Sequence, residues 1–306
     1  MLNELPLVIF TIAAQMSAGS FIVLGLINVL GIGVKQETME RVTNPALYAI
    51  GPLLMLGFIA SATHLGHPLN ALNAIRHFPA SPLSLEVVVG SAFLGVGALF
   101  AVLQWFKLGP ARLRQAVAVL AALLGVALVW AISQVYSLST VPAWATSYTP
   151  LRFFLTAFLL GGLAVGAALV IAAGVRAKKG DELEAAGTNL VKRSVRGIAF
   201  GAILALGLKS IGLPAYIGYL GTHPSPAASE SLHLLTDTYG AFSAAQTILV
   251  FAGIALLGYL LYRLSGQADA GSRLLPTIAV ASFLLVLAGE VIGRMLFYAS
   301  MVRVGV

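Results

Sequence analysis

The strongest constraint on the fold is a series of long apolar stretches that recurs from one end of the chain to the other. A helix that crosses the roughly 30 Å hydrocarbon core of a bilayer needs about 20 consecutive apolar residues. Backbone polar groups that face lipid must be satisfied within their own segment, so each stretch predicts a helix rather than an open-edged strand. The sequence therefore predicts an all-α, polytopic membrane protein, with eight transmembrane helices in a single domain over residues 1–306. Turn residues such as Asn44 and Pro45 separate the predicted spans, which are Leu7–Ile32, Pro45–Thr63, Leu85–Phe106, Gln115–Leu138, Leu151–Val175, Val195–Leu220, Ala241–Leu264 and Leu275–Ser300.

The composition argues against the soluble classes of protein. Apolar and aromatic residues make up 59% of the chain and charged residues only 9%, whereas a soluble domain carries about 25% charged residues. The net charge of +7 would suit a nucleic-acid partner, but the Lys and Arg residues gather in a few loops. We therefore expect no nucleic-acid partner, and we expect membrane lipids to surround the protein.

The distribution of Lys and Arg predicts the orientation in the membrane. The four loops that follow spans one, three, five and seven hold 13 of the 18 basic residues, and the opposite side holds 3. Cytoplasmic loops carry an excess of Lys and Arg. Both termini are therefore predicted on the outer, periplasmic side of a bacterial or archaeal cytoplasmic membrane. The longest cytoplasmic connection, Arg176 to Arg196, is expected to be a charged segment with a short exposed helix.

The content of Cys and His bears on redox chemistry. The sequence has no Cys, which removes disulfides, covalently attached haem and Cys-ligated iron–sulfur clusters. A membrane haem generally needs two axial ligands at membrane depth on facing helices. The histidines do not fit that pattern, because all five lie on the predicted outer side: His64, His67, His77, His223 and His233. We expect no haem, no iron–sulfur cluster and no metal site, so electrons would have to pass to a partner.

The densest polar cluster joins the second and third predicted spans at the outer face. His64 ends one span and Glu86 begins the next, so a short distance in space is expected despite the distance in sequence. Such a pair suits quinol oxidation, because a neutral His accepts a hydrogen bond and a proton from the quinol hydroxyl. A neighbouring carboxylate then passes the proton outward. The alternative is structural: His64 caps a helix in the wet interface, and Glu86 is favoured by the helix dipole.

A second group of polar residues lies on the eighth span. Glu290 and Arg294 are four residues apart in the favourable order, and Tyr298 continues the same helix face outward. Two interpretations are open: a structural ion pair that locks helix packing, or a role near the same pocket. Ionisable residues inside a membrane usually face the bundle interior.

Polar residues elsewhere in the sequence also have expected roles. Lys209, within the sixth span, is expected to pair with Glu290 or another buried acceptor. Gln15 is expected to form an interhelical hydrogen bond, with the lining of a pocket as the alternative. Arg76, in the loop after His64, joins the candidate quinol-binding residues. The aromatic loop from Thr140 to Pro150 predicts an aromatic belt at the lipid boundary, or a docking surface for an outer partner.

Several of these segments, taken in order, resemble one protein family. The sequence is similar to the membrane anchor subunits of the dimethyl sulfoxide reductase complexes, the DmsC family. The likeness runs from the first span to the last and is weakest between Arg176 and Tyr239. It is carried by Pro6–Thr11, Gln15, Ala18–Gly19, Phe21–Leu24, Gly57–Ser61, His64–Gly66, Pro68, Ala80–Ser81, Leu83–Ser84, Glu86, Thr140–Pro142, Trp144, Thr149–Pro150, Phe153–Thr156, Leu287–Glu290, Ile292–Arg294 and Phe297–Tyr298.

The resemblance implies a function and a set of partners. It implies an eight-helix anchor without haem that oxidises menaquinol as its bound substrate. It also implies an iron–sulfur subunit with four clusters on the outer face and a molybdopterin catalytic subunit beyond it. The family's quinol-site histidine corresponds to His64, and its acidic partner corresponds to Glu86.

Three other functions stay open at this point. A small-solute transporter needs polar groups near the middle of several spans, which only Lys209 and the Glu290–Arg294 pair supply. A membrane tether without a quinone site would show the same composition. A conformational proton pump of the related polysulfide-reductase type would need an extended path of buried acids, and few are present.

Overall fold

The computed structural model describes residues 4–64, 75, 78–181, 183–265 and 274–305. Every regular element within these ranges is helical, as the sequence predicts. Eight of the described helices have 24 residues or more. Seven of those eight, all except α2, have the length and apolarity of a membrane span, so the count of eight spans remains a prediction. The long helices are α1 (Leu5–Leu30), α2 (Gln36–His64), α4 (Pro82–Trp105), α5 (Ala111–Tyr136), α6 (Tyr148–Lys179), α7 (Ala185–Thr222), α9 (Gly240–Ser265) and α10 (Leu274–Ala299).

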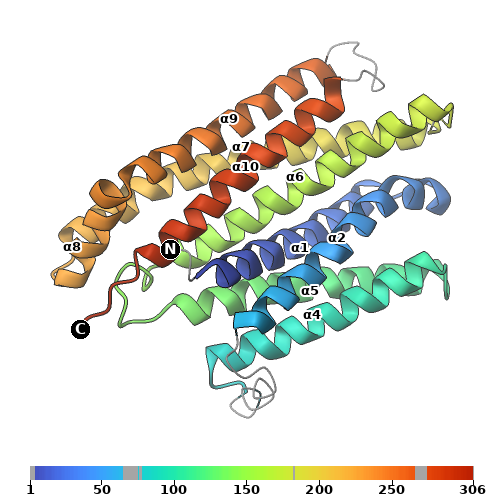
Figure 1. The fold of residues 1–306 in the computed structure, drawn as a ribbon. Helices are drawn as coiled ribbons and strands as arrows, with labels where there is room; N and C mark the ends of the chain where they lie inside the picture. Colours follow the sequence, from blue (N-terminus) through green and yellow to red (C-terminus); the bar gives the residue numbers. More distant parts are fainter. Residues whose placement is uncertain (1–3, 65–74, 76–77, 182, 266–273, 306) are drawn as a thin grey trace.

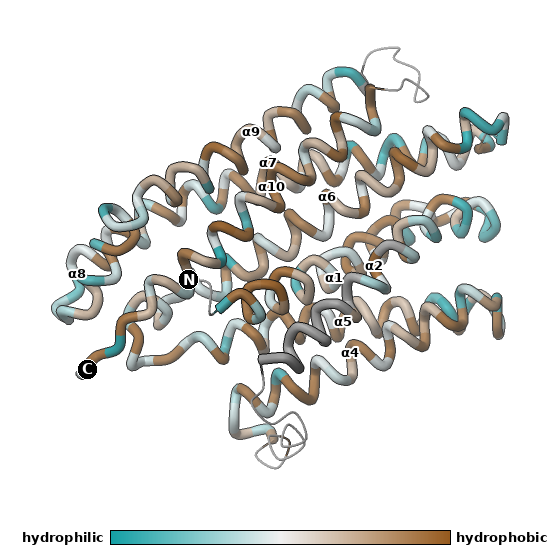
Figure 2. Tube along the Cα trace, in the orientation of Figure 1, coloured by the Kyte–Doolittle hydropathy of each residue, from teal (hydrophilic) through white to brown (hydrophobic). Residues whose placement is uncertain are grey.

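The long helices run back and forth between two ends of one elongated bundle (Figure 1). Both termini of the protein, the α5–α6 connection and the short helix α8 (Pro226–His233) lie at one end, which we call the terminal end. The α1–α2, α4–α5 and α6–α7 connections lie at the opposite end, which we call the basic end. Hydrophilic residues gather towards the ends of the helices, and apolar residues dominate between them (Figure 2). This pattern matches the alternation that the apolar stretches predict.

The helices form two groups of four. In the first group α1 packs on α2 and α5, and α4 packs on α5. In the second group α6 packs on α7 and α10, and α9 packs on α10. The two groups meet chiefly where α1 packs against α6 at the centre of the bundle (Figure 1). Residues from both groups therefore line the bundle interior.

Glycine allows the close approach of α1 and α6. A Cβ added to Gly19 would overlap the carbonyl of Ala157, and one added to Gly161 would overlap the backbone of Gly19 and Ser20. The hydroxyl of Ser20 donates to the Gly161 carbonyl at 3.3 Å. Small residues permit this backbone contact in a membrane, where dispersion and polar contacts replace the hydrophobic effect between helices.

The structure corrects the predicted start of the second span. Helix α2 begins at Gln36, ahead of the predicted turn at Asn44 and Pro45, and it continues through Pro45. A proline removes the hydrogen bond to the carbonyl four residues earlier. Here that carbonyl, on Arg41, accepts a hydrogen bond from Nη2 of Arg176 at 2.6 Å. A side group from another helix thus satisfies the freed carbonyl, and the helix does not end.

The connection at Arg176–Arg196 also differs from the prediction. Helix α6 extends to Lys179, and α7 starts at Ala185. Gly180 closes α6 in the left-handed conformation at φ 69°, which glycine adopts without a Cβ clash. The basic residues are therefore carried mainly on the extended ends of two long helices rather than on a separate short one.

Candidate functional site

The predicted His64–Glu86 pair falls at the terminal end of the bundle. Helix α2 ends at His64, and α4 begins a few residues before Glu86, at Pro82. These two helix ends lie on the same side of the molecule (Figure 1). For His64 the structure describes the helical backbone, and Arg76 falls outside the described residues. The His64–Glu86 distance therefore stays a prediction.

Glu86 lies at the rim of the bundle, by which we mean the edge of the terminal end where α2 ends and α4 begins, and it is near buried polar groups. Its side chain is half-buried on α4. Its carboxyl group is close enough to interact electrostatically with the hydroxyls of Tyr136 on α5 and Tyr298 on α10. The predicted rim residue Glu86 and the predicted span-eight residue Tyr298 thus belong to one polar cluster.

The two tyrosines form the centre of that cluster. The hydroxyl of Tyr298 donates to the hydroxyl of Tyr136 at 2.8 Å, and both side chains are buried. Aromatic rings surround them: Trp144 meets Tyr136 edge-on at 5.3 Å between ring centroids, and Phe153 lies 5.7 Å from it. Such packing holds the two hydroxyls in fixed positions within an apolar setting.

Trp144 corrects the prediction of an aromatic belt. It is 4% exposed, stacks on Phe297 with 4.9 Å between centroids, and donates its indole N–H to the Phe297 carbonyl at 2.9 Å. Its N–H therefore finds a partner at the end of α10 rather than in the lipid headgroup region. This part of the loop is core, and it supports the tyrosine pair.

Arg294 and Gln15 continue the cluster inward. Nη2 of Arg294 donates to Oε1 of Gln15 at 2.7 Å, and the guanidinium lies 3.8 Å from the centre of the Phe153 ring. Gln15 is fully buried and Arg294 is 3% exposed. Two buried donors, Nη1 of Arg294 and Nε2 of Gln15, have no hydrogen-bond partner among the described residues. Unpaired buried donors are costly, so these two are suited to hold an oxygen atom of a ligand.

Glu290 does not pair with Arg294, which corrects the first interpretation of the span-eight motif. Its carboxylate is in contact with the Lys209 ammonium from α7 and accepts a hydrogen bond from Thr156 at 2.7 Å. The spacing of four residues gives Glu290 and Arg294 a shared helix face, but the guanidinium of Arg294 binds Gln15 instead. The expectation that Lys209 pairs with Glu290 is confirmed.

The predicted residues therefore divide into two sets in the structure. Glu86, Gln15, Arg294 and Tyr298 come together in one cluster, which we call the tyrosine cluster and which also contains Tyr136 and Phe153. Glu290 lies in a separate pair with Lys209. Tyr136 was not among the predicted site residues, although its position at the outer end of the fourth span offered a signal. Nothing local in the sequence marked Phe153 as the ring beneath Arg294.

The polar groups of the described residues do not form a metal site. No group of three or more His, Cys, Asp or Glu side chains in this part of the protein is arranged to hold a metal ion. The tyrosine cluster instead offers hydrogen-bond donors, phenol hydroxyls and one rim carboxylate. Those groups suit an uncharged ligand that carries oxygen atoms and exchanges protons.

Comparisons with known proteins give a consistent result. The sequence matches the family model "DMSO reductase anchor subunit (DmsC)" over residues 1–300. It is 36% identical over 307 residues to the C subunit of the anaerobic dimethyl sulfoxide reductase of Escherichia coli (strain K12), in a match that covers 99% of this protein and 96% of the relative. It is 30% identical to the YnfH subunit of an anaerobic dimethyl sulfoxide reductase of the same strain, over 99% and 96% of the two proteins. The C subunit of the anaerobic dimethyl sulfoxide reductase of Haemophilus influenzae is 27% identical, over 97% and 94%.

Proposed function

Because the protein belongs to the DMSO reductase anchor subunit (DmsC) family, and is thus a membrane anchor of a reductase complex, we propose that it oxidises menaquinol for that complex. The site we propose lies at the terminal end of the bundle, between the rim residues His64 and Glu86 and the tyrosine cluster. One observation carries the proposal: the cluster that holds the buried, hydrogen-bonded pair Tyr136–Tyr298 also holds two buried donors, Nη1 of Arg294 and Nε2 of Gln15, that have no partner among the described residues.

The electrons are proposed to leave to other subunits. The sequence has no Cys, so it lacks the ligands that iron–sulfur clusters require. The proposed direct acceptor is an iron–sulfur subunit with four clusters, docked on the terminal end. A molybdopterin catalytic subunit would receive the electrons from it and reduce the final acceptor. The names of the relatives, each a subunit of an anaerobic dimethyl sulfoxide reductase, support this assembly.

Proton transfer is the part of the reaction that the residues of this anchor perform. Menaquinol becomes menaquinone by losing two electrons and two protons, so each hydroxyl needs an acceptor for its proton. His64, at the end of α2, is proposed to accept a hydrogen bond and then the proton of one hydroxyl. Glu86, half-buried on α4, is proposed to pass protons from the site to the aqueous rim.

The other end of the quinol head group needs a fixed partner as well. Nη1 of Arg294 and Nε2 of Gln15 are buried donors that a quinol oxygen satisfies. Tyr298, in the same cluster, provides a hydroxyl that can both donate and accept a hydrogen bond. These contacts would hold the ring in one orientation, with one oxygen towards His64. Arg76 and Glu290 stay candidates for this site on the sequence pattern alone.

The side of the membrane follows from the charge distribution. The basic end carries most Lys and Arg residues and is proposed to face the cytoplasm. The terminal end then faces the periplasm across the cytoplasmic membrane. Protons from menaquinol are released there, and the reductase consumes protons on the same side. Turnover is therefore proposed to move little net charge, and charge translocation in proteoliposomes would contradict this.

Binding of a quinol analogue separates this function from that of a tether without a quinone site. We would titrate the purified full-length protein with a fluorescent hydroxyquinoline N-oxide. The proposal expects saturable binding that Glu86→Gln weakens roughly ten-fold, through loss of a charged hydrogen-bonding group. Glu230→Gln, an exposed change on α8 at the same end of the bundle, serves as the control. Binding that never saturates, as in partition into detergent, would favour the tether.

A further inference from the structure

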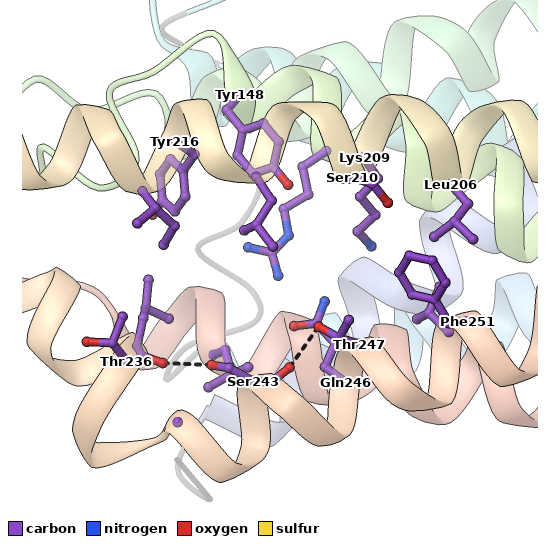
Figure 3. A pocket seen from close by; sticks show the side chains of 17 residues that line it. Tyr148, Leu206, Lys209, Ser210, Tyr216, Thr236, Ser243, Gln246, Thr247 and Phe251 are labelled. Carbon is purple, nitrogen blue, oxygen red and sulfur yellow. Dashed lines mark hydrogen bonds between the residues drawn. The ribbon is translucent and has the colours of Figure 1, made fainter.

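A cavity with polar groups in its lining lies between α6, α7 and α9. Its volume is about 300 Å³. Arg152 and Tyr148 from α6, Lys209 and Ser210 from α7, and Gln246 from α9 are among the residues that line it. Figure 3 shows Lys209 and Tyr148 entering this space from one side and Gln246 from the other. The proposed quinol site uses none of these five residues.

The charge of the cavity lining is positive. Arg152 and Lys209 line it, and no carboxylate of the described residues does. Glu290 lies behind Lys209 and neutralises that one ammonium. The guanidinium of Arg152 forms no ion pair among the described residues, and its Nη2 donates to the backbone carbonyl of Gly293. Glu290 also attracts it electrostatically, but one carboxylate balances only one of the two cations. The cavity therefore holds one uncompensated positive charge, which is costly in a membrane and favours an anion.

The lining also presents donors that have no protein acceptor among the described residues. The remaining N–H groups of Arg152, the Tyr148 hydroxyl and the Gln246 amide form no hydrogen bond with the described residues. The hydroxyls of Ser243 and Thr247, in contrast, already donate to backbone carbonyls at 2.8 and 3.0 Å (Figure 3). A planar guanidinium beside a phenol and an amide suits a group with several anionic oxygens, such as a phosphodiester.

One part of the cavity wall is apolar and reaches the lipid-facing surface. Leu206, Leu213 and Ile217 come from α7, and Val250 and Phe251 come from α9. Phe251 is 50% exposed and Leu213 is 43% exposed, while Val250 is buried at 3%. A ligand that fits this wall needs an apolar part that follows the seam between α7 and α9. An inorganic anion has no such part.

From the charge, the free donors and the apolar wall, we infer that this cavity binds the phosphodiester headgroup of an anionic phospholipid, with Arg152 as its main partner. Tyr148 and Gln246 donate further hydrogen bonds to the phosphate. The acyl chains lie along the seam between α7 and α9. The stacking of Tyr148 on Tyr216, with 5.0 Å between ring centroids, fixes the phenol in place. The bound lipid would tie α9 to the α6–α7 pair.

Native mass spectrometry of the delipidated full-length protein in detergent tests this inference. The protein is titrated with phosphatidylglycerol, phosphatidylcholine or diacylglycerol of the same acyl length. We expect one tightly retained phosphatidylglycerol, held at least ten-fold more tightly than the zwitterionic lipid, and no retention of diacylglycerol. Equal retention of phosphatidylglycerol and phosphatidylcholine would overturn the inference, because the positive charge would not be selecting the ligand.

Matched arginine variants locate the site. Arg152→Gln should weaken phosphatidylglycerol binding roughly ten-fold or more, through loss of charge-assisted hydrogen bonds. Arg263→Gln, on α9 at the basic end, should leave it unchanged. If Arg152→Gln does not fold, Gln246→Leu replaces it, and a several-fold loss of binding is expected. Unchanged binding in the folded cavity variants, or an equal loss in Arg263→Gln, would overturn the inference.

Two competitors distinguish the sources of the bound group. Millimolar inorganic phosphate and a short-chain naphthoquinone are each added to the protein with phosphatidylglycerol bound. Neither should displace the lipid if both the headgroup and the acyl chains are recognised. Displacement by phosphate alone would assign the cavity to a free anion, and displacement by the naphthoquinone would assign it to a quinone. Either result would overturn the lipid assignment.

Discussion

Tyr298 on α10 donates a hydrogen bond to Tyr136 on α5 across 2.8 Å, and this contact joins the two groups of four helices. Both phenols are buried, and both interact electrostatically with Glu86 on α4. The pair therefore sits where the proposed proton route leaves the interior. Replacing either tyrosine by phenylalanine would remove one hydroxyl oxygen and keep the packing of the ring, so the role of the hydroxyl can be tested without disturbing the fold.

Tyr298→Phe removes one hydroxyl and keeps the ring. We expect the quinol-dependent rate of the reductase complex to fall roughly ten-fold, with a loss of about 1 kcal/mol in stability from the missing hydrogen bond. Steady-state kinetics with a menaquinol analogue measure the rate, and thermal unfolding measures the stability. Tyr259→Phe, an exposed change on α9, should alter neither. An unchanged quinol rate in Tyr298→Phe would remove this hydroxyl from the site.

Lys209→Met would leave the buried carboxylate of Glu290 without its cation. Breaking a buried ion pair from one side typically costs about 3–5 kcal/mol, because the remaining charge is uncompensated. We expect a large fall in melting temperature for Lys209→Met, and recovery of most of it in the double variant Lys209→Met with Glu290→Met. A double variant as unstable as the single one would contradict the pairing.

The same double variant decides the role of Glu290. The structure places Glu290 against Lys209 and Thr156 rather than in the tyrosine cluster. If its role is structural, the double variant keeps quinol-dependent activity once its stability is restored. If activity is lost in a stable double variant, Glu290 belongs to the quinol site, which is the second of the two interpretations that the sequence left open.

Gly19→Ala tests the contact between the two helix groups. The added methyl group would overlap the Ala157 carbonyl on α6, and backbone atoms have little freedom to move away. We expect lower yield and a melting temperature several degrees below that of the wild-type protein. Gly258→Ala is the control, because a Cβ there meets nothing within 4 Å. It should be neutral or stabilising by up to about 1 kcal/mol, from helix propensity.

Glu40 offers a pH-dependent test at the basic end, before the apolar run of α2 begins. Burial disfavours its charged form, but hydrogen bonds from Gln36 and Arg114 outweigh burial and hold its pKa below the ordinary 4.5. The Arg114 Nη2 atom lies 2.6 Å from Oε1 of Glu40. A lowered pKa contributes stability above the unfolded-state pKa, and this stability is lost as the pH falls through the folded-state pKa.

Glu40→Gln should therefore melt about 2 °C below the wild-type protein at neutral pH. The difference should close as the pH is lowered past 4.5, the ordinary pKa of the carboxyl group. Differential scanning fluorimetry over a pH series measures it, with the exposed Glu37→Gln on the same helix turn as the control. A gap that persists or widens in acid would contradict the assigned ion pair.

The positions of the helices were largely predictable, because the length of an apolar stretch is set by the bilayer. The start of α2 was not, since the carbonyl freed by Pro45 is satisfied by Arg176 from a helix distant in sequence. Likewise, Gly180 and the short α6–α7 connection depend on how far two helices extend beyond the apolar core. The residues around a helix end do not reveal contacts with helices that are distant in the sequence.

The candidate site was predictable in its parts but not in its pairing. Spacing placed Arg294 and Tyr298 on one helix face, and the structure confirms that they belong to one cluster with Gln15. The partner of Arg294 was missed, because the rotation of α1 about its axis cannot be read from a helix that is apolar on every face. For the same reason nothing in the sequence paired Tyr136 with Tyr298. The roles of His64 and Arg76 remain predictions.

The most direct test of menaquinol oxidation at the rim compares two activities of the same reductase complex. Electrons are supplied either as a menaquinol analogue, which this anchor is proposed to oxidise, or as a reduced dye, which bypasses the proposed site. For His64→Ala and Glu86→Gln we predict that the quinol-dependent rate falls by about 100-fold or more, as loss of a proton acceptor does, while the dye-dependent rate stays unchanged. A His64→Ala complex that keeps its quinol-dependent rate would contradict the account.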